Sequence, residues 1–73
     1  MANLRFDGIG KSHSGLTLIW WVMSMGEDHL GNIQWHAPWR RYCFYPTANT
    51  IFDNNCLREI ADFCAEQTRN HNA

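Results

Sequence analysis

The clearest alternation of apolar and polar positions in the chain runs from Gly31 to Pro46. Successive side chains of a β-strand point to opposite faces, so a two-residue turn at Pro38 and Trp39 would fold this stretch into two paired strands. The turn pairs Ala37 with Arg40, His36 with Arg41, Trp35 with Tyr42, Gln34 with Cys43 and Ile33 with Phe44. One face then carries Ile33, Trp35, Tyr42 and Phe44, and the other carries Gln34, His36, Arg41, Cys43 and Tyr45. This split predicts a β-hairpin with one side in a core.

Residues 16–25 are β-branched and aromatic, which predicts a strand that precedes the hairpin. A four-residue loop after this strand would pair Val22 with Ile33 and Trp20 with Trp35. The opposite, outer face of the strand then also carries apolar side chains, namely Ile19, Trp21 and Met23. A half-buried strand is normally polar on its outer face. The outer set must therefore be covered, by the first 15 residues, by a second copy of the chain or by a foreign protein.

Residues 54–69 carry apolar side chains at three- and four-residue spacing, which predicts a helix. Asp53 is its expected N-cap, because its carboxylate can accept hydrogen bonds from the free N–H groups of the first turn. The apolar stripe consists of Cys56, Leu57, Ile60, Ala61, Phe63, Cys64 and Gln67. We expect this stripe to pack on the apolar face of the sheet.

These elements predict an α+β fold in which a three-stranded antiparallel meander carries one C-terminal helix on one face. Residues 1–15 form an N-terminal arm with a glycine- and serine-rich end, and the sheet becomes four-stranded if this arm adds an edge strand. The expected organisation is a single small domain over residues 1–73, with the arm at 1–15, the meander at 16–46 and the helix at 54–69.

Composition and charge narrow the class of protein. The 73 residues are 45% hydrophobic and 14% aromatic, which is enough for one small core, and the formal net charge is −1. Bulk charge does not indicate a nucleic-acid binder. Three cysteines do not suggest a disulfide-stapled domain, the first residues lack the apolar segment of a signal peptide, and the run at 16–25 is too short to span a bilayer. We therefore expect a cytoplasmic protein without a membrane partner.

The side chains that could carry chemistry do not form a recognisable site. Gly8-Ile9-Gly10-Lys11-Ser12 matches the end of a phosphate-binding loop, but Arg5 stands where that motif requires glycine. Cys56 and Cys64 are separated by about 12 Å of helix rise, too far to share a metal ion or a disulfide. A nucleophile, a base and an orienting group are not held together by any rigid frame. We expect neither enzymatic activity nor a metal or cofactor.

One pattern extends from the hairpin into the helix. Gly31-x-Ile33-x-Trp35-x-x-x-Trp39-Arg40-x-Tyr42-x-Phe44-x-Pro46, followed by Cys56-Leu57-x-x-Ile60-Ala61-x-Phe63, resembles a family of small accessory proteins encoded by phages and prophages. The resemblance covers residues 30–66 and leaves the arm and the first strand outside. It implies an accessory phage protein, and small proteins of this kind often bind and inhibit host complexes, including defence systems such as CRISPR.

Two binding hypotheses follow. In the first, the chain is a non-enzymatic protein in the host cytoplasm that binds a host or phage protein complex, or a second copy of itself. Its contact residues would be Ile19, Trp21, Met23, Trp39, Arg41 and Tyr45. In the alternative, the hairpin tip binds nucleic acid, because it combines cations with stacking rings. The residues of that site would be Trp39, Arg40, Arg41 and Tyr42, with Lys11 adding charge.

Overall fold

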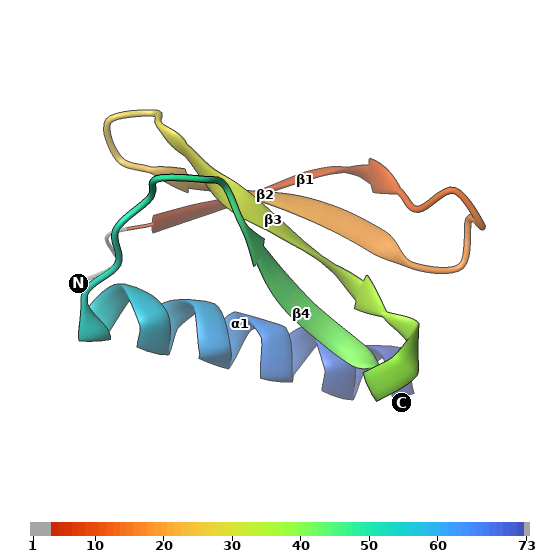
Figure 1. Cartoon of the computed structure of the whole chain (residues 1–73). Coiled ribbons are helices and arrows are strands. Elements are labelled where there is room, and N and C mark those ends of the chain that lie inside the picture. The colour runs from red at the N-terminus through yellow and green to blue at the C-terminus, as the bar shows by residue number, and fades with distance from the viewer. Residues whose placement is uncertain (1–3, 73) are drawn as a thin grey trace.

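The computed structural model describes residues 4–72 and arranges them as one sheet and one long helix (Figure 1). The elements are β1 (Leu4–Lys11), β2 (Leu18–Ser24), β3 (His29–His36), the short 3-10 helix η1 (Ala37–Trp39), β4 (Arg41–Pro46) and α1 (Asn54–Asn72). The sheet is antiparallel in the order β1-β2-β3-β4, and α1 covers one face of it. The predicted α+β fold is confirmed, in its four-stranded form. In the described part of the chain, no helix has both the length and the apolar character needed to cross a membrane.

Residues 4–11 of the N-terminal arm join the sheet as an edge strand and do not lie over its outer face. Phe6 of β1 pairs with Val22 of β2, so both side chains point to the helix side. Leu4 is buried there, and the ring of Phe6 stacks on Phe63 of α1 with centroids 4.2 Å apart. Within residues 4–15 the alternative in which the arm covers Trp21 is therefore wrong, because Leu4 and Phe6 are used in the core and Trp21 is 42% exposed.

The core lies between the sheet and α1. Its buried members are Leu4, Val22, Ile33, Tyr42 and Ile60. Aromatic rings fill the space around them: the ring of Tyr42 meets Trp20 and Trp35 edge-on, at centroid distances of 5.3 and 5.2 Å. Edge-to-face pairs of this kind add to the stability that burial provides, and each ring buries a large area. The aromatic content of the chain thus compensates for its small size.

Helix α1 begins where the sequence predicts and ends at Asn72, three residues beyond the predicted end. The backbone N–H of Cys56 donates to Asp53 Oδ1 at 2.8 Å, which confirms the N-cap, and this hydrogen bonding lowers the pKa of Asp53. Ile60 is buried, but Leu57 is 51% exposed, so the buried stripe is narrower than predicted. The helix packs chiefly beneath β4, an edge strand, and this leaves one flank of the predicted stripe open.

The predicted register of the β3–β4 hairpin is confirmed, from Ile33 opposite Phe44 to His36 opposite Arg41. The two-residue tip is wrong. Residues 37–39 form a 3-10 turn, and Arg40 adopts a left-handed conformation with φ of 55°. The N–H of Arg40 donates to the carbonyl oxygen of His36 at 2.9 Å. A helical turn followed by one left-handed residue is a common way to close a longer hairpin loop, and it needs four residues here.

The predicted register between β2 and β3 is wrong by two residues. Trp20 lies opposite Ile33 and Val22 lies opposite Gly31. The ladder then shifts, and Leu30 becomes the extra residue of a bulge and packs against the core. Because the shift is an even number of residues, every side chain of β2 keeps its predicted face.

Candidate binding surface

The outer face of the sheet, opposite α1, carries no second layer within residues 4–72 (Figure 1). The pairing places aromatic, aliphatic and polar side chains on it. They are Arg5 and Asp7 from β1, Ile19, Trp21 and Met23 from β2, Asn32, Gln34 and His36 from β3, and Arg41, Cys43 and Tyr45 from β4. The apolar outer set predicted from the sequence is therefore on the open side of the sheet.

The three outer side chains of β2 differ in accessibility. Trp21 is 42% exposed, and its ring lies 4.9 Å from the ring of His29. Ile19 is partly buried. Met23 is only 9% exposed, so the expectation that it is an accessible contact residue is wrong. Its neighbours in the ladder are Arg5 on β1 and His29 on β3, and neither pairing could be predicted without the edge strand and the bulge.

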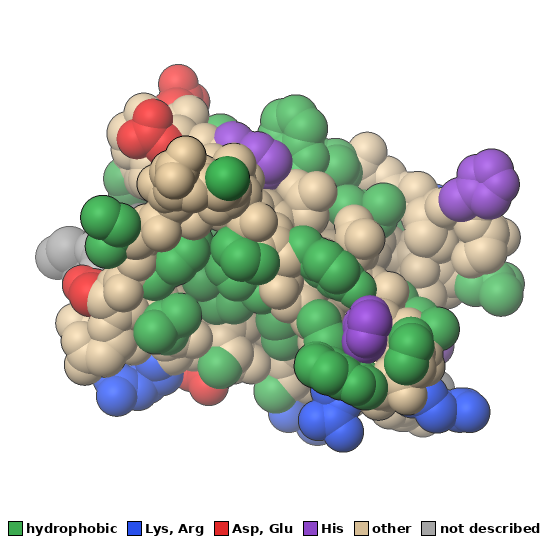
Figure 2. Space-filling model, in the orientation of Figure 1, with side chains coloured by type: hydrophobic (Ala, Val, Ile, Leu, Met, Phe, Trp, Pro, Cys, Tyr) green, Lys and Arg blue, Asp and Glu red, His purple; other side chains and the backbone are tan. Residues whose placement is uncertain are grey.

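A second group of outer side chains gathers at the hairpin end, and we call His36, Trp39 and Tyr45 the aromatic cluster. His36 Nδ1 and the Tyr45 hydroxyl share a hydrogen bond of 2.8 Å. The ring of Trp39 meets His36 edge-on at 4.8 Å, yet 65% of Trp39 is exposed. A shallow groove of about 190 Å³ runs beside these three rings. Figure 2 shows hydrophobic side chains gathered around a histidine at this end of the molecule.

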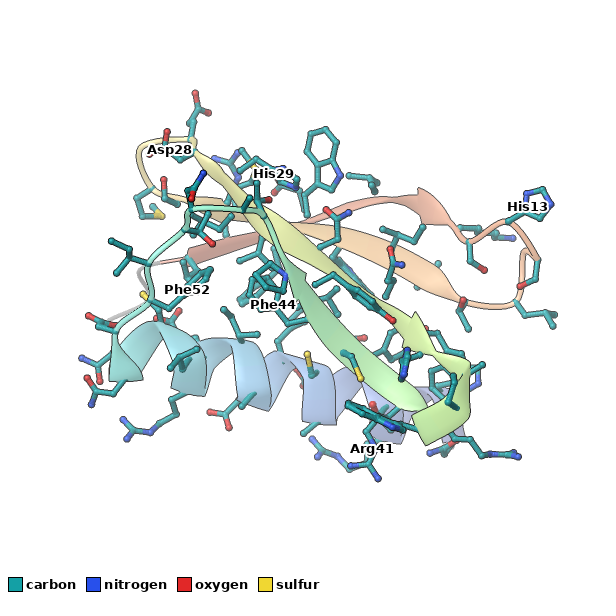
Figure 3. All side chains as sticks on the ribbon, in the orientation of Figure 1. His13, Asp28, His29, Arg41, Phe44 and Phe52 are labelled. Atoms are coloured by element: carbon teal, nitrogen blue, oxygen red, sulfur yellow. The ribbon has the colours of Figure 1, made fainter. Side chains whose placement is uncertain are left out.

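Arginine side chains adjoin the aromatic cluster. Arg40, Arg41 and Arg69 line a groove of about 530 Å³ between the hairpin end and the last turns of α1, which we call the arginine groove; its other lining residues are Tyr42, Ala65, Thr68 and Asn72. Arg41 Nε donates to the carbonyl oxygen of Trp39 at 3.3 Å, which ties the groove to the cluster. Figure 3 shows Arg41 at the start of β4, beside α1.

Sequence reasoning missed Arg69, and no spacing in the chain could have found it. Arg69 lies 28 residues after Arg41 in the printed sequence, and only the packing of α1 along β4 brings the two side chains to one groove. The structure does not bring Lys11 to the hairpin tip. Lys11 ends β1, at the opposite edge of the sheet from β4, and three strand spacings amount to about 14 Å.

The arginine side chains at the two edges of the sheet differ in whether a carboxylate lies beside them. On β1, Arg5 Nε lies 3.0 Å from Asp7 Oδ2, and Arg5 Nη1 lies 3.6 Å from Glu27 Oε1. These carboxylates, Asp7 first, raise the pKa of Arg5. In the arginine groove, no carboxylate of residues 4–72 lies within 4.0 Å of a guanidinium nitrogen. Within residues 4–72, positive charge is therefore paired with carboxylates at the β1 edge of the sheet and has no ion-pair partner in the arginine groove.

The segments that suggested other chemistry have ordinary structural roles. β1 continues through Gly8 and Lys11, and a turn rather than a helix follows it. In that turn the Thr17 hydroxyl donates to Ser12 Oγ at 2.8 Å, and His13 points away from the sheet (Figure 3). In the described part of the chain, no three His, Cys, Asp or Glu side chains come together as metal ligands.

The three cysteines, Cys43, Cys56 and Cys64, are free. Burial, with a smaller contribution from neighbouring Cys43, raises the pKa of the Cys64 thiol to about 11. Burial and then the carboxylate of Asp53 raise the pKa of Cys56. Because the thiolate is the nucleophilic form, both helix thiols are poor nucleophiles at neutral pH.

The described residues therefore present two adjoining surface features, the aromatic outer face with its cluster and the arginine groove. Comparisons with protein-family models, with curated proteins and with solved structures find no match for this chain.

Proposed function

We propose that this chain is a non-enzymatic protein-binding module that receives a partner protein on the outer face of its sheet. The observation that carries the proposal is a row of exposed aromatic side chains on an open sheet face: Trp21, Trp39 and Tyr45. Tryptophan, tyrosine and arginine dominate the binding energy of protein interfaces. Arg41 lies at the rim of the same surface, and Ile19 adds apolar area beside Trp21.

The contacts within the aromatic cluster support this proposal. His36 holds Tyr45 by a hydrogen bond and Trp39 by a ring contact, so two large side chains are positioned before any partner arrives. Side chains that are already ordered lose less conformational entropy on binding. A partner gains most by placing an apolar side chain in the groove beside these rings, where 190 Å³ is available.

The biological setting that we propose rests on the sequence resemblance alone. A small accessory phage protein with an open binding face would act in the cytoplasm of the host cell, by occupying a surface of a host or phage protein complex and modulating or inhibiting it. A defence system such as CRISPR is one such complex. A second copy of this chain is the alternative occupant of the face.

The test compares two substitutions that each replace a partly exposed apolar side chain by aspartate. Trp21→Asp places a carboxylate on the outer face, and Leu57→Asp does the same at a similarly exposed position on α1, on the other side of the sheet. Partner complexes are purified from host cells with each tagged variant and identified by mass spectrometry. We expect Trp21→Asp to lose a specific partner that Leu57→Asp retains, with unchanged far-UV circular dichroism in both.

Three results would contradict the proposal or redirect it. If Trp21→Asp unfolds the domain, or if both variants keep the same partners, the outer face is not the binding surface. Sedimentation of the pure protein tests the remaining possibility, in which the outer face binds a second copy of the chain. A dimer that Trp21→Asp converts to monomer assigns the face to a second copy.

The alternative function, nucleic-acid binding at the hairpin tip, keeps one supporting observation. Exposed Trp39 stands beside Arg40 and Arg41, a combination that suits base stacking and phosphate contact. It is weakened because Lys11 lies at the opposite edge of the sheet from the tip. The expectation that Tyr42 is a stacking residue of the tip is wrong, because Tyr42 is only 5% exposed and belongs to the core. A labelled single-stranded oligonucleotide should shift at low salt, with affinity that falls steeply as salt rises, and no shift would exclude this function.

A further inference from the structure

We infer that the arginine groove binds the carboxylates of an acidic segment of the partner protein. This inference rests on the proposed function and adds the chemistry of the partner to it. The groove is formed by the hairpin end on one side and the last turns of α1 on the other, and Arg40, Arg41 and Arg69 are among its lining residues.

The first argument is the concentration of charge. Three of the six lysine and arginine residues of the chain line one groove, and no carboxylate of residues 4–72 lies within 4.0 Å of their guanidinium nitrogens. The C-terminal dipole of α1 accounts for a cation at Arg69. It does not account for Arg40 and Arg41, which come from a different element. Like charges that are placed together without counter-charges favour an anionic ligand.

The second argument is the donor geometry. Arg41 uses Nε for the carbonyl oxygen of Trp39, which fixes the direction of the side chain and leaves its terminal nitrogens available. A guanidinium presents its N–H groups as a planar fork that matches the two oxygens of a carboxylate. Thr68 and Asn72 add polar groups to the wall, and Tyr42 and Ala65 add apolar ones.

The third argument concerns the length of the ligand. Along α1, Arg69 also borders a neighbouring groove whose lining includes Asp62 and Glu66. The positive surface therefore ends within one groove, and the chain as a whole carries a net charge of −1. Nucleic-acid binders usually present a longer basic track. A short acidic segment fits a positive surface of this extent better than a continuous polyphosphate does.

The fourth argument is continuity. The hydrogen bond between Arg41 and Trp39 places the arginine groove directly beside the aromatic cluster. A segment with an apolar side chain next to one or two acidic residues could cover both. Charges at the edge of such an interface chiefly set association rate and specificity, while the aromatic rings supply affinity.

The experiment uses the free, isotope-labelled protein and does not need the partner. A blocked hexaglutamate peptide is titrated at low ionic strength while the arginine Nε–Hε resonances are followed by NMR. We expect saturable shifts for Arg40, Arg41 and Arg69 and none for Arg58, which donates to Asn55 on the exposed side of α1. Arg69→Gln should weaken peptide binding about tenfold or more, and the matched control Arg58→Gln should leave it unchanged.

Other results overturn the inference. Absence of saturation, or equal weakening by Arg69→Gln and Arg58→Gln, would show that the groove has no specific anion site. Tighter binding of a hexathymidylate oligonucleotide than of the peptide would assign the groove to nucleic acid. Failure here is distinct from failure of the proposed function, because the Trp21→Asp and Leu57→Asp comparison tests the outer face without the groove.

Discussion

The backbone amide of Tyr42 donates a hydrogen bond of 3.0 Å to the hydroxyl oxygen of Thr68. The same hydroxyl donates to the carbonyl oxygen of Cys64 at 2.9 Å. Tyr42 belongs to β4, whose ladder with β3 uses its other edge, so this amide has no strand partner. A helix side chain takes the place of the next strand, and α1 closes this edge of the sheet at one point.

Thr68→Val keeps the shape of the side chain but removes both hydrogen bonds. The amide of Tyr42, a residue only 5% exposed, is then left without a partner. We expect the free energy of unfolding to fall by about 1–3 kcal/mol, measured by urea denaturation. Thr68→Ser, which keeps the hydroxyl, is the control and should lose much less. Equal stability of the two variants would show that this bond is unimportant.

Gly31→Ala should destabilise the fold for a steric reason. A Cβ at this position would lie 2.5 Å from the carbonyl oxygen of Tyr45 and 2.6 Å from the ring of Phe44. Overpacking of this kind typically costs about 1–3 kcal/mol. Gly8→Ala is the matched control, because its Cβ would meet only the Trp20 ring at 3.6 Å, an ordinary contact. Thermal unfolding should separate the two variants, and similar melting temperatures would contradict the prediction.

Ile60→Ala should remove a large part of the stability of the domain. Ile60 is 4% exposed and belongs to the core, whereas Leu57 is 51% exposed on the same helix. Truncation of a buried isoleucine costs about 2–5 kcal/mol, and a small domain has little more than that to lose. Leu57→Ala should change the free energy of unfolding far less, in the same urea titration. A larger loss for Leu57→Ala would contradict the packing of α1 described above.

Stability should also fall at alkaline pH, through Cys64. The thiol has a pKa of about 11 in the folded chain, above its ordinary value of 9.0. The unfolded chain therefore loses this proton first, so the contribution to stability is complete below pH 9 and is lost as the pH rises toward 11. We expect the difference in urea midpoint between the unmodified chain and Cys64→Ala to narrow over that range, in reducing buffer. Parallel curves would show that Cys64 does not titrate in this way.

Much of the fold follows from local patterns in the sequence. Four cross-strand pairs of the β3–β4 hairpin, such as Trp35 with Tyr42, could be predicted because strict alternation fixes which side chains share a face. Asp53 could be predicted as N-cap because its role depends on the next three residues alone. The four-residue tip of the hairpin could not be predicted, because arginine is not a residue type that usually adopts the left-handed conformation found at Arg40.

The remaining errors concern features that depend on tertiary structure. The β2–β3 register differs because the turn closed by Ser24 and Asp28 is shorter than predicted and Leu30 bulges to pack against the core, and no periodicity shows either feature. The same bulge places His29 opposite Met23 in the ladder, and Met23, which we expected to be exposed, is only 9% exposed. Trp21 and Tyr45 could be placed on the outer face from alternation, whereas Arg69 enters the site only through the docking of α1.

The order β1-β2-β3-β4 means that each strand pairs with its immediate neighbour in the chain. Closing such short loops costs little conformational entropy, so the sheet can assemble hairpin by hairpin. Only α1 must find a surface distant in sequence. A topology with so few contacts between residues distant in sequence favours rapid folding. The docking of α1 on the sheet is the step on which the folding rate should depend most.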